Sequence, residues 1–163
     1  MKTIRAGLSF SVLLILLAVA VFTVAARGET LKADARIALD AQGQHSGKFS
    51  APDLTVNYTY ARTGTDMNLS GTVRFDMPIR ANYAVVQTFR LDLALADAQG
   101  NVIGQQGLAS ASDNDVGDPV SFSATVAVPE QTASMAFTYT GEAFAADPGD
   151  PDPTNFWFYP FDN

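Results

Sequence analysis

The sequence predicts an all-β protein: an immunoglobulin- or fibronectin-like antiparallel β-sandwich preceded by an N-terminal hydrophobic helix. Three observations lead to this fold class. Apolar residues recur at every second position in six segments between residues 53 and 140, as expected for strands with one buried face. Turns rich in Gly, Pro, Asn and Asp separate these segments. No stretch among them shows the three-to-four-residue apolar period of a helix.

The first two predicted strands form a hairpin. Residues 53–61 alternate Leu, Val and Tyr with Thr and Asn, and residues 67–76 repeat this alternation. The segment 62–66 between them contains Gly and Asp and supplies the hairpin loop. Met77-Pro78 ends the second strand, because proline cannot donate to a sheet ladder.

Four further strands follow with similar spacing. Residues 85–96 form the longest one, and residues 102–111 return as a strand interrupted by Gly, which predicts a position at a sheet edge. A polar loop over residues 112–118 leads to a strand at 120–128, and residues 135–140 close the series. Two sheets packed face to face bury one face of every strand with the fewest assumptions. A partly open β-barrel is the alternative.

The predicted architecture is similar to the fibronectin-like accessory domains of bacterial exported proteins, although no motif assigns the chain to a family. A domain of this size buries roughly two-thirds of its unfolded surface. The fold therefore needs no disulfide, in agreement with the absence of cysteine.

The start of the chain has the features of an export segment. Lys2 and Arg5 precede an uncharged, apolar run from Ala6 to Ala26. The small residues at the end of the run make Ala26 a plausible cleavage site for a signal peptide. An uncleaved signal anchor is the alternative, because the run would rise roughly 30 Å as a helix and cross a bilayer core. In both cases we expect the remainder to be exported to the bacterial periplasm, either anchored in the inner membrane or soluble after cleavage.

The pattern divides the chain into four parts. Residues 1–26 are the signal peptide or signal-anchor helix, and residues 27–52 are a linker that carries either a short helix or a first strand. Within that linker, the Gly- and Ser-rich run from Ala41 to Ala51 predicts a loop or spacer. Residues 53–143 are the β-sandwich domain, and residues 144–163 are an acidic, Pro-rich linker with an aromatic tail.

Charge is distributed unevenly along the chain, whose formal net charge is −7. Residues 1–90 hold all ten bases and six acids, whereas residues 91–163 hold eleven acids and no base. The second part therefore cannot neutralise phosphates, which excludes nucleic-acid binding there. A negative pole on the domain predicts a protein partner with a basic surface. One His and no Cys also exclude thiol catalysis and Cys/His zinc sites.

The polar loop 112–118 is the metal candidate of the sequence. Asp113, Asp115 and Asp118 place carboxylate oxygens along a short turn, and oxygen ligands suit Ca²⁺. The loop departs from the Asp-x-Asp-x-Asp-Gly pattern, because Gly117 comes at the fifth position. The alternative is a solvated hairpin loop in which Asp and Asn serve turn geometry. The sequence indicates no other cofactor.

The C-terminal tail is the candidate partner-binding segment, because aromatic side chains of this density are costly to leave in water. Its aromatic residues are Phe156, Trp157, Phe158, Tyr159 and Phe161. The tail either packs on its own sandwich as a last edge strand or docks on a partner.

No motif of nucleophilic, acid–base or metal catalysis is present, so we expect a noncatalytic protein. The sequence favours an exported accessory, assembly or interaction subunit of the bacterial cell envelope, which would also contact the membrane through residues 6–26 if they are not cleaved. A carbohydrate- or small-ligand-binding module is the first alternative. A hydrolase is the second, and no residues mark its active site.

Overall fold

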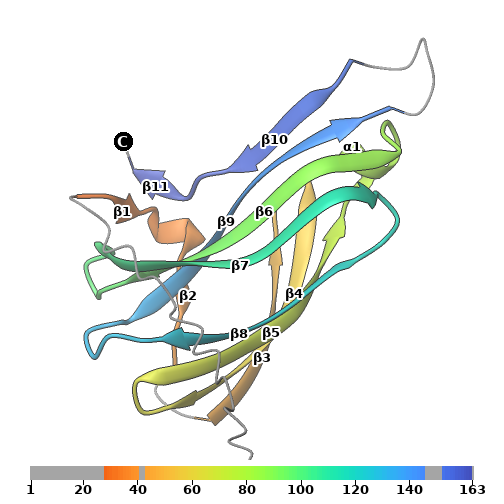
Figure 1. Cartoon of the computed structure of the whole chain (residues 1–163). Coiled ribbons are helices and arrows are strands. Elements are labelled where there is room, and N and C mark those ends of the chain that lie inside the picture. Colours follow the sequence, from red (N-terminus) through yellow and green to blue (C-terminus); the bar gives the residue numbers. More distant parts are fainter. Residues whose placement is uncertain (1–27, 41–42, 146–151, 163) are drawn as a thin grey trace, which may run out of the picture.

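The computed structural model describes residues 28–40, 43–145 and 152–162 (Figure 1). The predicted hydrophobic helix at residues 6–26 lies outside the described residues. In the part of the chain that is described, no helix has both the length and the apolar character needed to cross a membrane.

The described residues form a series of antiparallel strands with two short helical turns. The elements in chain order are β1 (Thr30–Leu31), a 3-10 turn (Ala33–Ala35), β2 (Ile37–Ala38), β3 (Gly43–Ser50), β4 (Leu54–Thr63), β5 (Asp66–Phe75), α1 (Met77–Arg80), β6 (Val85–Ala96), β7 (Val102–Asp115), β8 (Val120–Ala127), β9 (Ser134–Phe144), β10 (Thr154–Phe158) and β11 (Phe161–Asp162).

Two antiparallel sheets make up the body of the protein (Figure 1). One has the strand order β3-β4-β5-β8, and the other has the order β10-β9-β6-β7, with β2 also paired to β9. The short strands β1 and β11 form a separate ribbon. The sheets do not close into a barrel. The predicted all-β fold with antiparallel sheets is confirmed, and the two-sheet arrangement is consistent with a sandwich.

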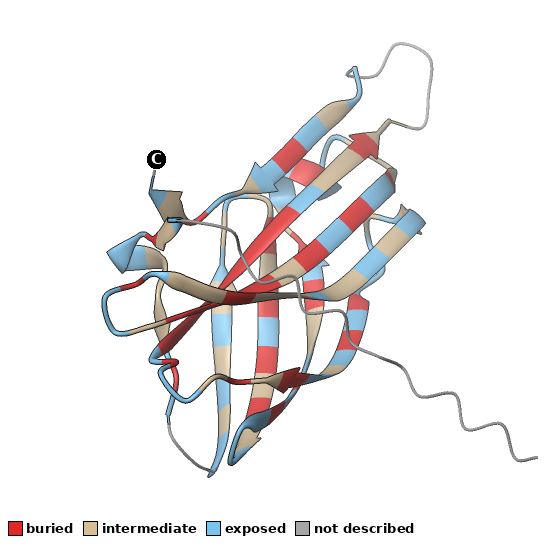
Figure 2. Ribbon diagram, turned by 60° about the vertical axis from the view of Figure 1, so that its left-hand side comes forward, coloured by how far each residue is buried: buried red, intermediate tan, exposed pale blue. Residues whose placement is uncertain are grey.

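The core lies between the two sheets and follows from the period-two pattern. Buried and exposed residues alternate along the strands as bands (Figure 2). Aromatic rings connect the layers: Phe75 of β5 meets Phe89 of β6 edge to face at 5.3 Å, and Tyr58 of β4 lies 5.2 Å from Phe137 of β9. The buried apolar side chains of β4, β5, β6, β8 and β9 form this core, whose burial is the main source of stability in such a fold.

The largest correction concerns the predicted loop at residues 41–51, most of which forms strand β3. All eight residues of β3 pair with β4. Gly47 lies opposite Tyr58, and a side chain at Gly47 would overlap the Tyr58 ring. Phe49 reaches the core, 5.5 Å from Phe137. The glycine in this segment therefore leaves room on the edge strand β3 for the Tyr58 ring of β4.

Further differences occur at the ends of the predicted elements. The strand β7 runs to Asp115, so it includes the first half of the predicted polar loop at 112–118. The helix α1 follows β5, with Pro78 in its first turn, where the missing N–H costs no hydrogen bond. The predicted edge position of β7 is confirmed, since β7 pairs only with β6 among the described strands.

Candidate partner-binding strand and pocket

The aromatic tail forms the outermost strand of one sheet. Thr154 to Phe158 make up β10, which pairs antiparallel with β9 over five residues. Because side chains alternate along a strand, Phe156 faces the core and Trp157 faces away from it. The tail therefore packs as a last edge strand, which is one of the two arrangements expected from the sequence.

Phe156 is the main anchor of this strand. Its side chain is 4% exposed and contacts the rings of Phe75, Phe89 and Tyr139. The residue opposite it is Gly141, and a side chain there would overlap the Phe156 ring. The glycine thus leaves the space that lets the tail enter the core.

Two further aromatic residues of the tail also face the domain. Phe158 is half-buried and stacks on Tyr139, with ring centroids 6.1 Å apart. Phe161 of β11 packs against a small second cluster around Leu31. Phe156, Phe158 and Phe161 therefore use much of their apolar surface within the chain, as expected if the tail packs on its own sandwich.

Trp157 and Tyr159 remain exposed, as binding to a partner would require. Their exposed fractions are 59% and 55%, and the third large apolar residue exposed to this degree is Met77 of α1, at 68%. Within the described residues β10 pairs only with β9, so its second edge is open. An open edge next to two exposed aromatic side chains is a surface that a partner segment can use.

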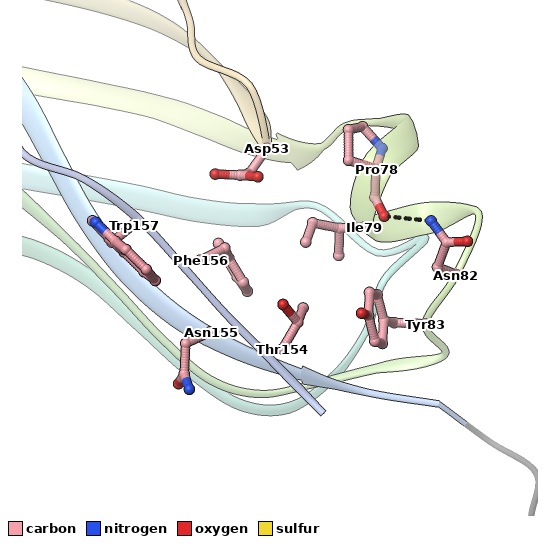
Figure 3. Close-up of a pocket in the computed structure, with 9 residues that line it drawn as sticks. All are labelled: Asp53, Pro78, Ile79, Asn82, Tyr83, Thr154, Asn155, Phe156 and Trp157. Atoms are coloured by element: carbon pink, nitrogen blue, oxygen red, sulfur yellow. Dashed lines mark hydrogen bonds between the residues drawn. The ribbon is translucent and has the colours of Figure 1, made fainter. Parts of the chain in front are cut away.

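A pocket of about 310 Å³ lies beside β10 (Figure 3). Its walls come from three places: the residues before β4, α1 with the turn after it, and β10 itself. The lining residues are Asp53, Pro78, Ile79, Asn82, Tyr83, Thr154, Asn155, Phe156 and Trp157. The volume falls in the lower range of small-molecule sites, and the lining combines aromatic rings with amide and carboxyl groups.

The Asp53 carboxylate at the pocket wall is held by a hydrogen bond from a buried tyrosine. The Tyr139 hydroxyl donates a hydrogen bond of 2.9 Å to Asp53 Oδ2. Burial is the main cause that raises the pKa of Tyr139 above its ordinary value of 10.0, and the hydrogen bond to Asp53 is the second. The phenol therefore stays protonated and holds the Asp53 carboxylate in place at the pocket wall.

The outer sheet face beside Trp157 is polar. In register, Trp157 lies opposite Thr140 of β9, which in turn lies opposite Arg90 of β6. The Arg90 guanidinium donates to both oxygens of Asp92, with distances from 2.7 to 2.9 Å. This ion pair is exposed to solvent, so it contributes little to stability. Arg90 lies on the same outer face as the exposed indole, with β9 between them.

The predicted calcium loop is organised by its own turn bonds. Asp115 Oδ1 accepts a hydrogen bond of 2.7 Å from the backbone N–H of Gly117, and the Asn114 amide donates to the carbonyl oxygens of Asp115 and Asp118. Asp113 adopts a positive φ of 52°. Among the described residues, no three His, Cys, Asp or Glu side chains are grouped as a metal site, so Asp113, Asp115 and Asp118 are not brought together as ligands. The arrangement follows the turn chemistry of Asn and Asp.

The sequence singled out Phe156 and Trp157 but not the other residues that line the pocket. Asn82 and Tyr83 follow a helix of four residues that has no apolar period, and Asp53 is one of many turn aspartates. Only the packing of β10 beside α1 brings them together. The one available signal was the alternation of Phe156 and Trp157, which separates an inward from an outward face.

Comparison with protein-family models, curated proteins and solved structures finds no match to this chain.

Proposed function

We propose that this chain is a noncatalytic, exported protein that acts as an accessory, assembly or interaction subunit of the bacterial cell envelope and docks a protein partner through β10. The observation that carries this proposal is the outward exposure of Trp157 and Tyr159, at 59% and 55%, on a strand with an open edge. Aromatic residues of this kind dominate binding energy in protein interfaces.

We also propose that the two sheets have an immunoglobulin- or fibronectin-like strand arrangement. The order β4-β5-β8 packs on β7-β6-β9-β10, and between β4 and β10 the chain changes sheet after β5, β7 and β8. Such crossings support an immunoglobulin- or fibronectin-like arrangement, to which β3 adds one more edge strand. Export through residues 6–26, as a cleaved signal peptide or a retained anchor, rests on the apolar run alone.

Docking at β10 uses two kinds of contact. An extended partner segment pairs with the open edge through backbone hydrogen bonds, and the indole of Trp157 supplies a desolvated centre. The neighbouring sheet face carries Glu142 of β9 and the Arg90–Asp92 pair, whose charges cancel, and β10 carries no base. This charge favours a partner with a basic surface, whose association weakens as salt rises.

The test is a pull-down of the full chain from native membranes in mild detergent, with the partner identified and its affinity measured. Trp157→Ala combined with Tyr159→Ala should weaken capture at least about a hundredfold, in line with truncation of two central aromatic residues. Met77→Ala is the matched control, because Met77 is equally exposed but lies on α1. Equal capture by the double variant and the control would contradict docking at β10.

The pocket favours a second candidate function, the binding of a neutral saccharide. The Trp157 indole lies at a pocket that also offers the Asn82 and Asn155 amides and the Asp53 carboxylate (Figure 3). Sugars stack on aromatic faces and hydrogen-bond such groups. Trp157 is the single Trp of the chain, so its fluorescence reports binding directly. A change in fluorescence that saturates with maltotriose and is absent in Asn155→Ala would support this candidate, whereas an unchanged spectrum would contradict it.

A further inference from the structure

A second concave surface, which we name the lysine groove, lies on the side of the molecule where β3 and β10 are the edge strands of their sheets. It has a volume of about 430 Å³. Its walls come from the segment around the 3-10 turn, the end of β3 and the end of β10. Its charged and aromatic lining residues include Lys32, Asp34, Arg36, Lys48, Phe158 and Tyr159.

The groove concentrates positive charge in an acidic protein. The sequence has three lysines, and the two within the described residues, Lys32 and Lys48, both line this groove. Both side chains are exposed, and neither takes part in the ion pairs found among the described residues. The net charge of −7 makes such a gathering of ammonium groups an exception to the rest of the surface.

Arg36 adds a fixed positive charge to the wall. Its Nε and Nη2 donate hydrogen bonds of 2.9 and 2.6 Å to the carbonyl oxygen of Leu31. Its guanidinium also lies against Gly100, where any side chain would overlap it. These contacts hold the guanidinium in one position, so Arg36 adds a fixed positive electrostatic potential to the groove. The two lysines supply the groups that can contact a ligand.

An aromatic surface completes the groove. Phe158 is held by Phe49, with ring centroids 5.4 Å apart, and by Tyr139 behind it. Tyr159 follows it and is 55% exposed. A pyranose ring can stack its apolar face on such a ring.

We propose that the lysine groove binds an acidic saccharide, with a uronate carboxylate between the ammonium groups of Lys32 and Lys48 and a sugar ring on Tyr159. Charge-assisted hydrogen bonds from the two ammonium groups hold the carboxylate. The Asp34 carboxylate on the same wall accepts hydrogen bonds from sugar hydroxyls. The site lies apart from the pocket beside Trp157 but shares Tyr159 with the docking surface, so substitution of Trp157 separates the two proposals.

The experiment is calorimetric titration of the full chain in mild detergent with trigalacturonate. Lys32→Gln and Lys48→Gln should each weaken binding at least about tenfold, because each removes a charged hydrogen-bond donor. Arg74→Gln is the control: it removes one positive charge from an exposed position on β5, and its affinity should stay within about twofold. Tyr159→Phe should retain affinity, and Tyr159→Ala should lose it, because stacking needs the ring and not the hydroxyl.

Four outcomes would overturn the proposal. No saturable binding of trigalacturonate, or equal weakening by Lys48→Gln and Arg74→Gln, shows that the groove is not the site. Equal affinity for a glutamate hexapeptide shows that the groove selects carboxylate charge and not a sugar. Equal affinity for acetate shows a simple anion site. Trp157→Ala should leave trigalacturonate affinity unchanged, so failure here is distinguishable from failure of docking or of neutral saccharide binding.

Discussion

The ring of Phe156 occupies the space that a side chain on Gly141 would need, and the two residues lie directly opposite each other on β10 and β9. Gly141 also lies opposite Phe89, whose ring stacks on that of Phe156 at an interplanar angle of 16°. A single residue without a side chain therefore allows the C-terminal strand to insert its anchor into the core. This contact makes residues 154–158 part of the sandwich.

Gly141→Ala should destabilise the protein by about 1–3 kcal/mol, because the added methyl group overpacks a filled site. Urea unfolding gives the free energy. Gly104→Ala is the matched control, since Gly104 lies on β7 of the same sheet and its nearest side-chain atoms would be 3.8 and 3.9 Å from an added Cβ. The control should change the free energy of unfolding by less than about 1 kcal/mol. Equal losses in the two variants would contradict the close contact with Phe156.

Truncation of two neighbouring residues of β10 should change the stability of the protein by very different amounts. Phe156→Ala should cost about 3–5 kcal/mol of stability, because it opens a cavity between Phe75 and Phe89. Trp157→Ala should change stability by only about 0.5 kcal/mol, because the indole is largely exposed. Thermal and urea unfolding of both variants measure the difference. A large loss in Trp157→Ala, or a small one in Phe156→Ala, would mean that the strand is placed differently.

Tyr139 should make stability fall at alkaline pH. Burial and the hydrogen bond to Asp53 raise the pKa of Tyr139 in the folded state above the value of 10.0 that it has when exposed. A group whose pKa is raised on folding stabilises the protein fully below its unfolded pKa, and this contribution is lost as pH rises toward the folded pKa. We expect a loss of up to about 1.4 kcal/mol for each pH unit above about 10.

Urea unfolding between about pH 9 and about pH 11.5 measures this slope. Tyr139→Phe should reduce it, whereas the exposed Tyr159→Phe should not. The pKa of Tyr58 is also raised, by burial and then by Tyr60, so part of the slope should remain in both variants. Identical slopes in Tyr139→Phe and the unsubstituted protein would contradict a buried, protonated phenol at Asp53.

Calcium should not stabilise the fold. The carboxylates of Asp113, Asp115 and Asp118 are not gathered as ligands, and the Asp115 carboxylate already accepts the Gly117 N–H. A ligand that binds only the folded state raises the melting temperature by mass action. Melting curves with millimolar Ca²⁺ and with chelator should therefore coincide, and an upward shift with Ca²⁺ would restore the loop as a metal site.

The strands with strict alternation could be predicted from the sequence because their buried positions are apolar. In β4, Leu54 and Val56 alternate with Thr55 and Asn57, and the structure buries the first pair. The strand β3 could not be found this way, because its position opposite Tyr58 is Gly47. There the pairing comes from the neighbouring strand, and the local sequence resembles a loop.

The candidate site could be predicted only in part. The density of aromatic residues indicated that the tail contacts something, and the choice between its own domain and a partner depended on tertiary packing. The structure places Phe156 inside the core and leaves Trp157 largely exposed. Asn82, Asp53 and Lys48 had no distinguishing local pattern, since sites assembled from distant segments appear only when the sheets are packed.

The central claim is that the outer side of β10 is a docking surface. Photo-crosslinking in native envelopes tests it most directly, with a photoreactive residue placed at Trp157 and, as the control, at Met77. We predict one discrete protein adduct from position 157 that is absent from position 77 and is lost when Tyr159→Ala is added. Adducts of equal yield from both positions, or no adduct from position 157, would contradict the claim.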